Sequence, residues 1–136
     1  ILPTTGHPSF ELPDGEMEIG IGIHGEPGIH RGPLESADQI ADRIITALVA
    51  DLDLTSGSRV AVLVNGLGAT PLEELYVLFR RVHTLLAERG ITIAKSYVGE
   101  YATSLEMAGA SISLLELNDE RLALLEAPAK SPFFEE

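Results

Sequence analysis

Apolar residues alternate with small or charged residues near the start of the chain. From Glu16 onward every second residue is apolar, while Gly20 and Gly22 fall on the opposite face. Alternation with period two predicts a strand over residues 16–23 that has one bare face. The apolar positions are Met17, Ile19, Ile21 and Ile23. A continuous apolar run over residues 60–64 predicts a second strand that is buried on both faces or central in a sheet.

Two longer segments have helical periodicity instead. Ser36 and Gln39 form a capping box that begins the first helix, and Thr70 is the expected cap of the second, which ends at Gly90. Pro71 is expected at the first position of that helix, with Glu73 closing its capping box. The expected buried residues are Ile40, Ile44, Ala47 and Leu48 in the first helix, and Leu72, Leu75, Phe79, Val82 and Leu86 in the second.

The remaining elements are shorter. The pattern predicts strands over 91–98 and 111–117, one or two helical turns over 102–107, and a last helix that begins at Asn118 or Asp119 and ends at Leu125. Residues 1–15 are rich in proline and glycine and are expected to form an extended arm, while the tail from Pro128 is expected to be loose. Strands that alternate with helices predict a single α/β domain over residues 16–136.

Composition restricts the class of protein. The chain has 136 residues, 45% of them apolar, which is enough for one domain with a real core. Its net charge of −12 argues against nucleic acid and anionic membranes as partners. There is no cysteine, and no apolar run approaches the roughly 20 residues that cross a bilayer. A cytoplasmic protein is the simplest interpretation, and a chain that starts at Ile1 suggests a fragment, a processed product or a trimmed protein.

His24 is the main candidate for chemistry. It follows the apolar strand directly, within Gly22-Ile23-His24-Gly25-Glu26-Pro27-Gly28, and α/β proteins place their ligands at the carboxyl ends of strands. Gly22 and Gly25 leave room beside the ring. A neutral imidazole there can act as a nucleophile, a base or a ligand, whereas a single histidine is more often structural. The turn over residues 26–29 suits type II geometry, with Gly28 at the position that needs a positive φ.

Other motifs favour structural roles. His24 and Glu26 lack further ligands at metal-binding spacing, so no metal site is expected. The loop over residues 65–70 lacks a P-loop lysine, which favours a plain turn over a phosphate site. Thr103 and Ser104 lack a nucleophile elbow and are expected to act in turns. Of the other histidines, His7 and His30 are expected in solvated loops, and His83 on the margin of a helix stripe.

Several of these motifs together resemble the substrate-binding subunit or domain of the dihydroxyacetone kinases. The matching segments are 16–28, Val64 to Pro71, 103–109, 111–115 and 126–128, in the expected order. The resemblance implies a two-layer α/β unit with a mixed sheet, helices mainly on one face, and a parent subunit that dimerises. It also implies that His24 attacks the ketone carbon of dihydroxyacetone and holds it as a covalent hemiaminal, in glycerol metabolism.

The resemblance also implies parts that this chain lacks. The family's N-terminal lobe, with its catalytic aspartate, and the nucleotide-binding, magnesium-holding domain have no counterpart here. The chain is therefore expected to be a second lobe that is inactive alone, with no cofactor-binding or metal-binding residue of its own. ATP with magnesium, or a phosphotransferase relay that uses bound ADP, would act on another domain or subunit.

Three interpretations stay open at the level of sequence. The first is the histidine-bearing lobe of a kinase for dihydroxyacetone or a related short sugar such as glyceraldehyde or erythrulose. The second is a paralogue that senses a ketose and regulates a partner protein without catalysis. The third is an α/β interaction domain in which His24 has no role in ligand binding.

Overall fold

The computed structural model describes residues 4–8, 10–22 and 26–136. The strands are β1 (Glu16–Ile19), β2 (His30–Pro33), β3 (Arg59–Gly66), β4 (Thr92–Gly99), β5 (Ala110–Glu116), β6 (Lys130–Ser131) and β7 (Phe134–Glu135). The helices are α1 (Ala37–Asp51), α2 (Leu72–Glu88) and α3 (Asp119–Leu125). Within the described ranges, no helix is both long and apolar enough to cross a membrane.

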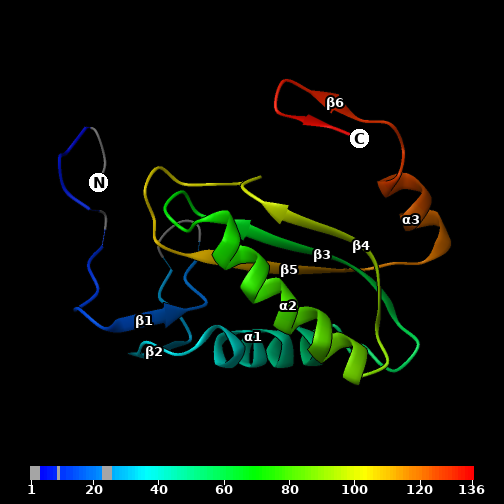
Figure 1. The fold of residues 1–136 in the computed structure, drawn as a ribbon, viewed down its shortest axis with the longest axis horizontal. Coiled ribbons are helices and arrows are strands. Elements are labelled where there is room, and N and C mark those ends of the chain that lie inside the picture. The colour runs from blue at the N-terminus through cyan, green and yellow to red at the C-terminus, as the bar shows by residue number, and fades with distance from the viewer. Residues whose placement is uncertain (1–3, 9, 23–25) are drawn as a thin grey trace.

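A three-stranded mixed sheet forms the centre of the fold. The strand order is β4-β3-β5, in which β3 pairs with β4 in parallel and with β5 in antiparallel orientation. Helices α1 and α2 lie together against one face of this sheet (Figure 1). The central position of β3 explains its continuous apolar run, since Val60, Val62 and Val64 are fully buried under the helices. The predicted α/β fold with a mixed sheet and helices on one face is confirmed.

The N-terminal strand belongs to a separate hairpin. β1 pairs with β2 in antiparallel orientation, from Glu16 opposite Pro33 to Ile19 opposite His30. This hairpin lies at the end of the central sheet to which β3 and β4 point (Figure 1). The predicted strand over 16–23 is too long, because regular pairing stops at Ile19 and Gly20 takes a φ of +82°. β2 was not predicted, since its polar sequence becomes a strand only through pairing with β1.

The helices keep their predicted places, with different buried faces. The capping box of Ser36 and Gln39 is confirmed. In α1 the fully buried residues are Ala41 and Ile45, whereas Ala47 is exposed, contrary to prediction. In α2, Leu72 is half exposed and Phe79 only partly buried. The residues of α2 that are buried are Leu75, Leu78, Val82, Leu85 and Leu86.

The caps of the other helices differ from expectation in one case. Pro71, not Thr70, is the N-cap of α2, and it makes no side-chain capping bond. The Thr70 hydroxyl instead donates to the carbonyl of Gly109 at 2.8 Å. Gly90 follows α2 with a φ of +70°, and Asn118 caps α3 through the N–H of Arg121, both as predicted.

Two predictions for the second half of the chain are wrong. Residues 102–107 form no helix, because their polar groups bond to the loop that follows β3. The tail is not loose: β6 and β7 pair as a hairpin, in which Lys130 lies opposite Glu135. That hairpin is held to β4, since Glu136 forms an ion pair with Lys95 and accepts a hydrogen bond from the Tyr97 hydroxyl at 2.8 Å.

Candidate functional site

The predicted nucleophile, His24, lies outside the described residues, together with Ile23 and Gly25. The residues on either side of it are described. The N–H of Gly22 donates to the carbonyl of Glu26 at 3.0 Å, and the N–H of Ile29 donates to the carbonyl of Ile19 at 2.8 Å. These two bonds hold together the two ends of the segment that contains His24. The described residues that flank His24 in the chain, Gly22 and Glu26, are therefore joined to each other next to the β1–β2 hairpin.

Glycines around this segment are required by close packing. The N–H of Gly28 donates to Oε1 of Glu18 at 2.6 Å. A Cβ at position 28 would lie 2.6 Å from the carbonyl oxygen of Ile19, and one at position 22 would lie 2.8 Å from Cβ of Glu26. Gly28 has no positive φ, so the predicted type II turn over residues 26–29 is wrong. Gly28 is needed there for space rather than for a left-handed conformation.

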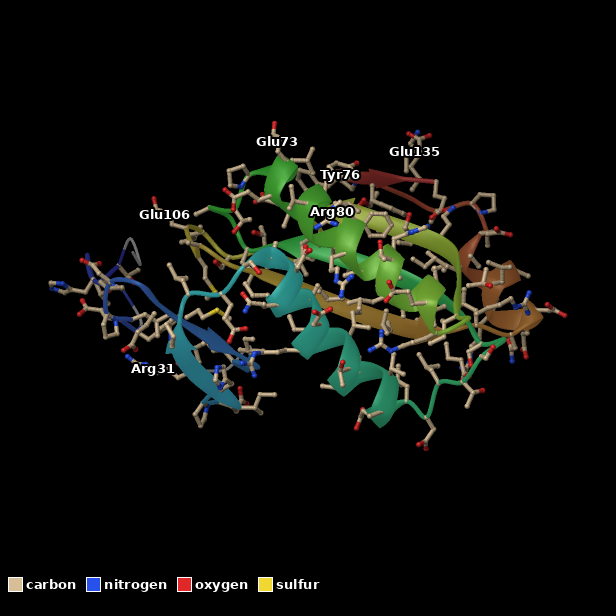
Figure 2. All side chains as sticks on the ribbon, turned by 60° about the horizontal axis from the view of Figure 1, so that its bottom comes forward. Arg31, Glu73, Tyr76, Arg80, Glu106 and Glu135 are labelled. Atoms are coloured by element: carbon tan, nitrogen blue, oxygen red, sulfur yellow. The ribbon has the colours of Figure 1, made fainter. Side chains whose placement is uncertain are left out.

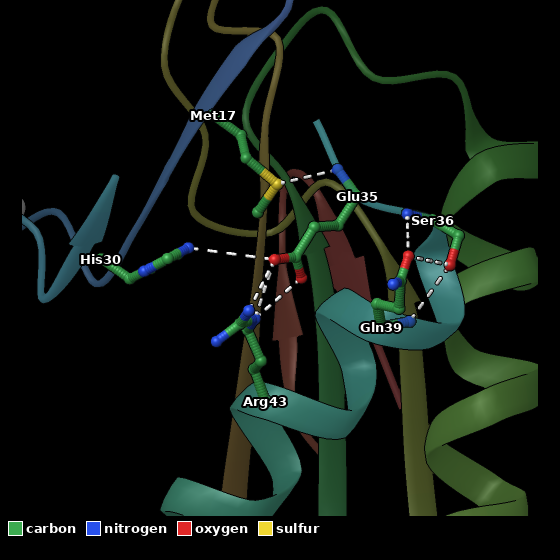
Figure 3. A network of polar contacts seen from close by, with 6 residues as sticks. All are labelled: Met17, His30, Glu35, Ser36, Gln39 and Arg43. Carbon is green, nitrogen blue, oxygen red and sulfur yellow. Dashed lines mark hydrogen bonds and ion pairs between the residues drawn. The ribbon is translucent and has the colours of Figure 1, made fainter. Parts of the chain in front are cut away.

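The carboxylate of Glu35 joins the hairpin to α1 (Figure 3). Glu35 lies between β2 and Ser36, the N-cap of α1. Arg43, two turns into α1, donates to both of its carboxylate oxygens, with Nε at 2.8 and 3.0 Å and Nη2 at 2.7 Å. The N–H of Glu35 contacts Sδ of the buried Met17 on β1 at 3.3 Å. On β2, Nε2 of His30 lies 3.8 Å from Oε1 of Glu35.

Electrostatics favour the ionised form of Glu35. Its side chain is 13% exposed, and the hydrogen bonds from Arg43 lower the pKa of its carboxyl below the usual value. The Nε2 atom of His30 is buried and has no hydrogen-bond partner among the described residues. His30 lies at the start of β2 rather than in a loop, contrary to prediction, and its side chain is 37% exposed. His7 is exposed as predicted, and His83 is exposed with its ring centroid 6.4 Å from that of Phe79.

Other ion pairs of the described chain connect different elements. Arg31 and Glu16 pair at 2.9 Å within the hairpin, and both side chains are more than a third exposed. Arg80 on α2 pairs with Asp38 on α1, and Arg81 pairs with Asp42. Figure 2 shows Arg31 on the hairpin and Arg80 on α2, apart from one another. The Glu35 cluster differs from these pairs because it brings residues of β1, β2 and α1 together.

A second polar centre lies at the carboxyl end of β3. Asn65 is 2% exposed, and its Oδ1 accepts hydrogen bonds from the N–H groups of Tyr101 at 2.8 Å and Ala102 at 2.9 Å. Its Nδ2 donates to the carbonyl of Ala102 at 2.8 Å and contacts Oγ of Ser111 at 3.4 Å. Asn65 thus fixes the loop after β4, which starts at the same end of the sheet as the hairpin (Figure 1).

The loops 65–70 and 101–109 are bonded to each other. The N–H of Met107 donates to the carbonyl of Leu67 at 3.1 Å, and the N–H of Ala69 donates to the carbonyl of Met107 at 3.1 Å. The Ser104 hydroxyl donates to the Leu67 carbonyl at 2.6 Å, and its oxygen accepts from the N–H of Met107 at 3.3 Å, a local bond that confirms the predicted turn role. Loop 65–70 is occupied by these contacts and is followed by the acidic Glu73 and Glu74 in the first turn of α2. The arrangement favours a structural turn over a phosphate site.

Two further features bear on ligand binding: clusters of metal-binding side chains and surface grooves. No three histidine, aspartate or glutamate side chains of the described residues gather as a metal site. A groove of about 600 Å³ runs along α2 and the edge strand β4, lined by Phe79, His83, Ala87 and Ile93 among others. It lies beside the second half of α2, whereas the hairpin lies at the opposite end of the sheet (Figure 1).

The sequence interpretation missed Glu35, Arg43 and the clamp role of Asn65. Asn65 carries a signal, since a polar residue at the end of a buried apolar strand needs hydrogen-bond partners. The Glu35–Arg43 pair has no such signal, because a spacing of eight residues is not a recognised helical pair and Glu35 precedes the helix.

Comparison with known proteins identifies the family. The Dak1 domain family matches residues 1–133. The chain belongs to the Dak1 family. It is 48% identical over 133 residues to the dihydroxyacetone-binding subunit DhaK of a PTS-dependent dihydroxyacetone kinase from Listeria innocua, covering 98% of this chain and 40% of that protein. It is 43% identical to the DhaK subunit of the PEP-dependent kinase of Escherichia coli, covering 96% of this chain and 44% of that protein.

Other members of the Dak1 family widen the range of functions among its relatives. An L-erythrulose kinase of Pectobacterium atrosepticum is 43% identical, covering 98% of this chain and 23% of that protein. Among solved structures, the dihydroxyacetone kinase operon co-activator Dha-DhaQ matches with a TM-score of 0.83 and 35% identity, over 93% of this chain and 40% of the other. The chain therefore spans less than half the length of each of these relatives.

Proposed function

We propose that this chain is the histidine-bearing lobe of a kinase for dihydroxyacetone or a related short ketose such as erythrulose. The observation that carries the proposal is the 48% identity to a dihydroxyacetone-binding subunit over nearly the whole chain. The described residues on either side of His24 support it, since Gly22 bonds to Glu26 and Ile29 bonds to Ile19 of the β1–β2 hairpin.

His24 would hold the substrate through a reversible covalent bond. A neutral imidazole nitrogen attacks the ketone carbon, a C–N bond forms, and the carbonyl π electrons move to oxygen. That oxygen gains a proton and the ring loses the proton of its other nitrogen, so the step is an addition without a leaving group. Glycerol has no carbonyl and cannot form the bond, which would make the carbonyl the feature that is tested.

Phosphoryl transfer would need groups outside this lobe. A base must take the proton of a terminal hydroxyl, and a phosphoryl donor must be held in line with it. We assign the base to a second lobe of the parent subunit and the donor, ATP with magnesium or a phosphotransferase relay, to a nucleotide-binding domain or partner. The chain alone would then bind no nucleotide or metal and transfer no phosphate. We place the parent protein in the cytoplasm as a homodimer.

A regulatory role is the second candidate, favoured by the match to the operon co-activator Dha-DhaQ. In that case ketose capture by His24 would change the affinity of the parent protein for a partner instead of preparing the ketose for phosphorylation. Identity is higher to DhaK subunits than to this co-activator, which is why the kinase role is preferred.

Both candidates can be tested in one replacement experiment. This chain would replace the matching segment of the Listeria innocua DhaK subunit, and the hybrid would be assayed with the other components of that kinase. The kinase role predicts ketose phosphorylation that His24→Ala abolishes. His7→Ala is the control, because His7 is exposed and lies outside the hairpin. A hybrid that captures ketose but does not phosphorylate it would favour the regulator, and full activity of His24→Ala would contradict both roles.

A further inference from the structure

We propose that Glu35 is a positioning residue for ketose capture, an inference that rests on the proposed function of His24. Glu35 would fix the β1–β2 hairpin against α1 and thereby hold Gly22 and Ile29, the described residues on either side of His24. Because β1 and β2 form a two-stranded sheet apart from the central sheet, the hairpin does not gain its orientation from strand pairing with the core. Its orientation must come from side-chain contacts and from the connection to α1.

The contacts of Glu35 meet this need. Its backbone N–H reaches the sulfur of Met17 on β1, its carboxylate lies 3.8 Å from the His30 ring on β2, and Arg43 of α1 holds both carboxylate oxygens (Figure 3). A bidentate arginine–carboxylate pair restricts angle as well as distance, because two parallel donors face two acceptors. Glu35 thus joins three elements, because its backbone N–H contacts β1 and its carboxylate lies between β2 and α1.

The position of Glu35 in the chain makes the clamp effective. It is the residue before Ser36, whose capping box with Gln39 fixes the first turn of α1. Pro33 at the end of β2 is two residues earlier, so the connection between hairpin and helix is short. We infer that loss of the Glu35–Arg43 pair would let the hairpin shift relative to α1, together with Gly22 and Ile29. Covalent capture is sensitive to such displacement, since a shift of about 1 Å can cost ~100-fold in rate.

The test compares Glu35→Ala with a matched ion-pair variant in the natural protein that carries this chain. Glu16→Ala is the control, because it removes the exposed pair with Arg31 inside the hairpin and leaves the link to α1 intact. Hydrogen exchange would be followed at the N–H groups of Gly22 and Ile29, whose bonds close the hairpin loop. Ketose capture would be followed by the rate and extent of adduct formation with dihydroxyacetone.

Glu35→Ala is expected to speed exchange at Gly22 and Ile29 and to slow ketose capture by between ~10-fold and ~100-fold. Protection within β3 should stay unchanged, and Glu16→Ala should alter neither the exchange at Gly22 and Ile29 nor ketose capture. Glu35→Gln, which keeps an acceptor oxygen for Arg43, is expected to recover part of the loss. If Glu35→Ala fails to fold, Arg43→Gln removes the same link from a half-exposed position.

The positioning role is overturned if Glu35→Ala and Arg43→Gln capture ketose at the wild-type rate. It is also overturned if capture falls while exchange at Gly22 and Ile29 is unaltered. Ketose capture by His24→Ala at the wild-type rate would instead refute the proposed function. The exchange data would then still decide whether Glu35 holds the hairpin.

Discussion

Asn65→Ala should destabilise the fold through the loop after β4. Asn65 is 2% exposed and makes three short hydrogen bonds with the backbone of Tyr101 and Ala102, at 2.8, 2.8 and 2.9 Å. Alanine removes all three bonds and leaves two N–H donors and one carbonyl without their partner. Because residues 101 and 102 are exposed, water can reach these groups, which limits the cost of leaving them unpaired.

The magnitude follows from these bonds. Each protein hydrogen bond contributes about 1 kcal/mol net, so their loss lowers the free energy of unfolding by about 3 kcal/mol. Ser111→Ala is the matched control, since it removes only the contact to Nδ2 at 3.4 Å and should cost less than about 1 kcal/mol.

Urea denaturation followed by circular dichroism would measure both variants, and hydrogen exchange would locate the effect. We expect the N–H groups of Tyr101 and Ala102 to lose protection in Asn65→Ala while those of α1 keep it. The reasoning is refuted if Asn65→Ala costs less than about 1 kcal/mol. It is also refuted if both loop amides stay protected.

Three further outcomes test the packing and the charges. Ile45→Ala, at a fully buried position, should lower the free energy of unfolding by about 2–5 kcal/mol in urea titration, whereas Leu124→Ala, 70% exposed, should stay within about 0.5 kcal/mol. Ser36→Ala should cost about 1 kcal/mol by the same assay, and an unchanged value would contradict the capping box. Since Arg43 lowers the pKa of Glu35, its ionised form stabilises the fold above the ordinary value of 4.5, and this contribution is lost as pH falls through the lowered pKa. Glu35→Gln should therefore have a lower free energy of unfolding than the wild type at pH 7, and the difference should shrink at low pH. An equal difference at both pH values would refute this.

Periodicity predicted the elements whose structure depends on local sequence. These elements are the apolar strand β3, the helices α1 and α2, and the caps at Ser36 and Asn118. Their sequence patterns act locally, so they do not depend on how the rest of the chain folds. The details of burial were harder to predict. Ala47 is exposed because the face of α1 is centred on Ala41 and Ile45, a rotation that depends on how α2 packs beside it.

Elements that depend on distant partners were missed or misjudged. β2 has a polar sequence and is a strand only because β1 lies beside it. Residues 102–107 were expected to be helical, yet the Ser104 hydroxyl donates to Leu67, and Met107 forms an isolated β-bridge with Gly68. These long-range contacts use polar groups that a helix would need. The tail forms a hairpin that Glu136 ties to Lys95 on β4.

The role of His24 stays a prediction, and the contacts that hold the neighbouring hairpin were not predictable. The sequence predicts open space at Gly22 beside His24, whereas the Glu26 side chain fills that space, and Gly28 packs as closely against Ile19. The clamp at Glu35 was not predictable, because it needs the hairpin and α1 to be placed relative to each other first. Its residues come from three elements that no local pattern joins.

Nuclear magnetic resonance of a labelled ketose tests the central claim most directly. The parent protein, labelled with ¹⁵N at histidine, would be mixed with dihydroxyacetone labelled with ¹³C at the carbonyl. A bond to His24 predicts a tetrahedral carbon signal split by a one-bond coupling to a ring nitrogen, absent from His24→Ala. Ketose that binds with its carbonyl carbon uncoupled to nitrogen in the wild-type protein, or a coupling that persists in His24→Ala, would contradict the account.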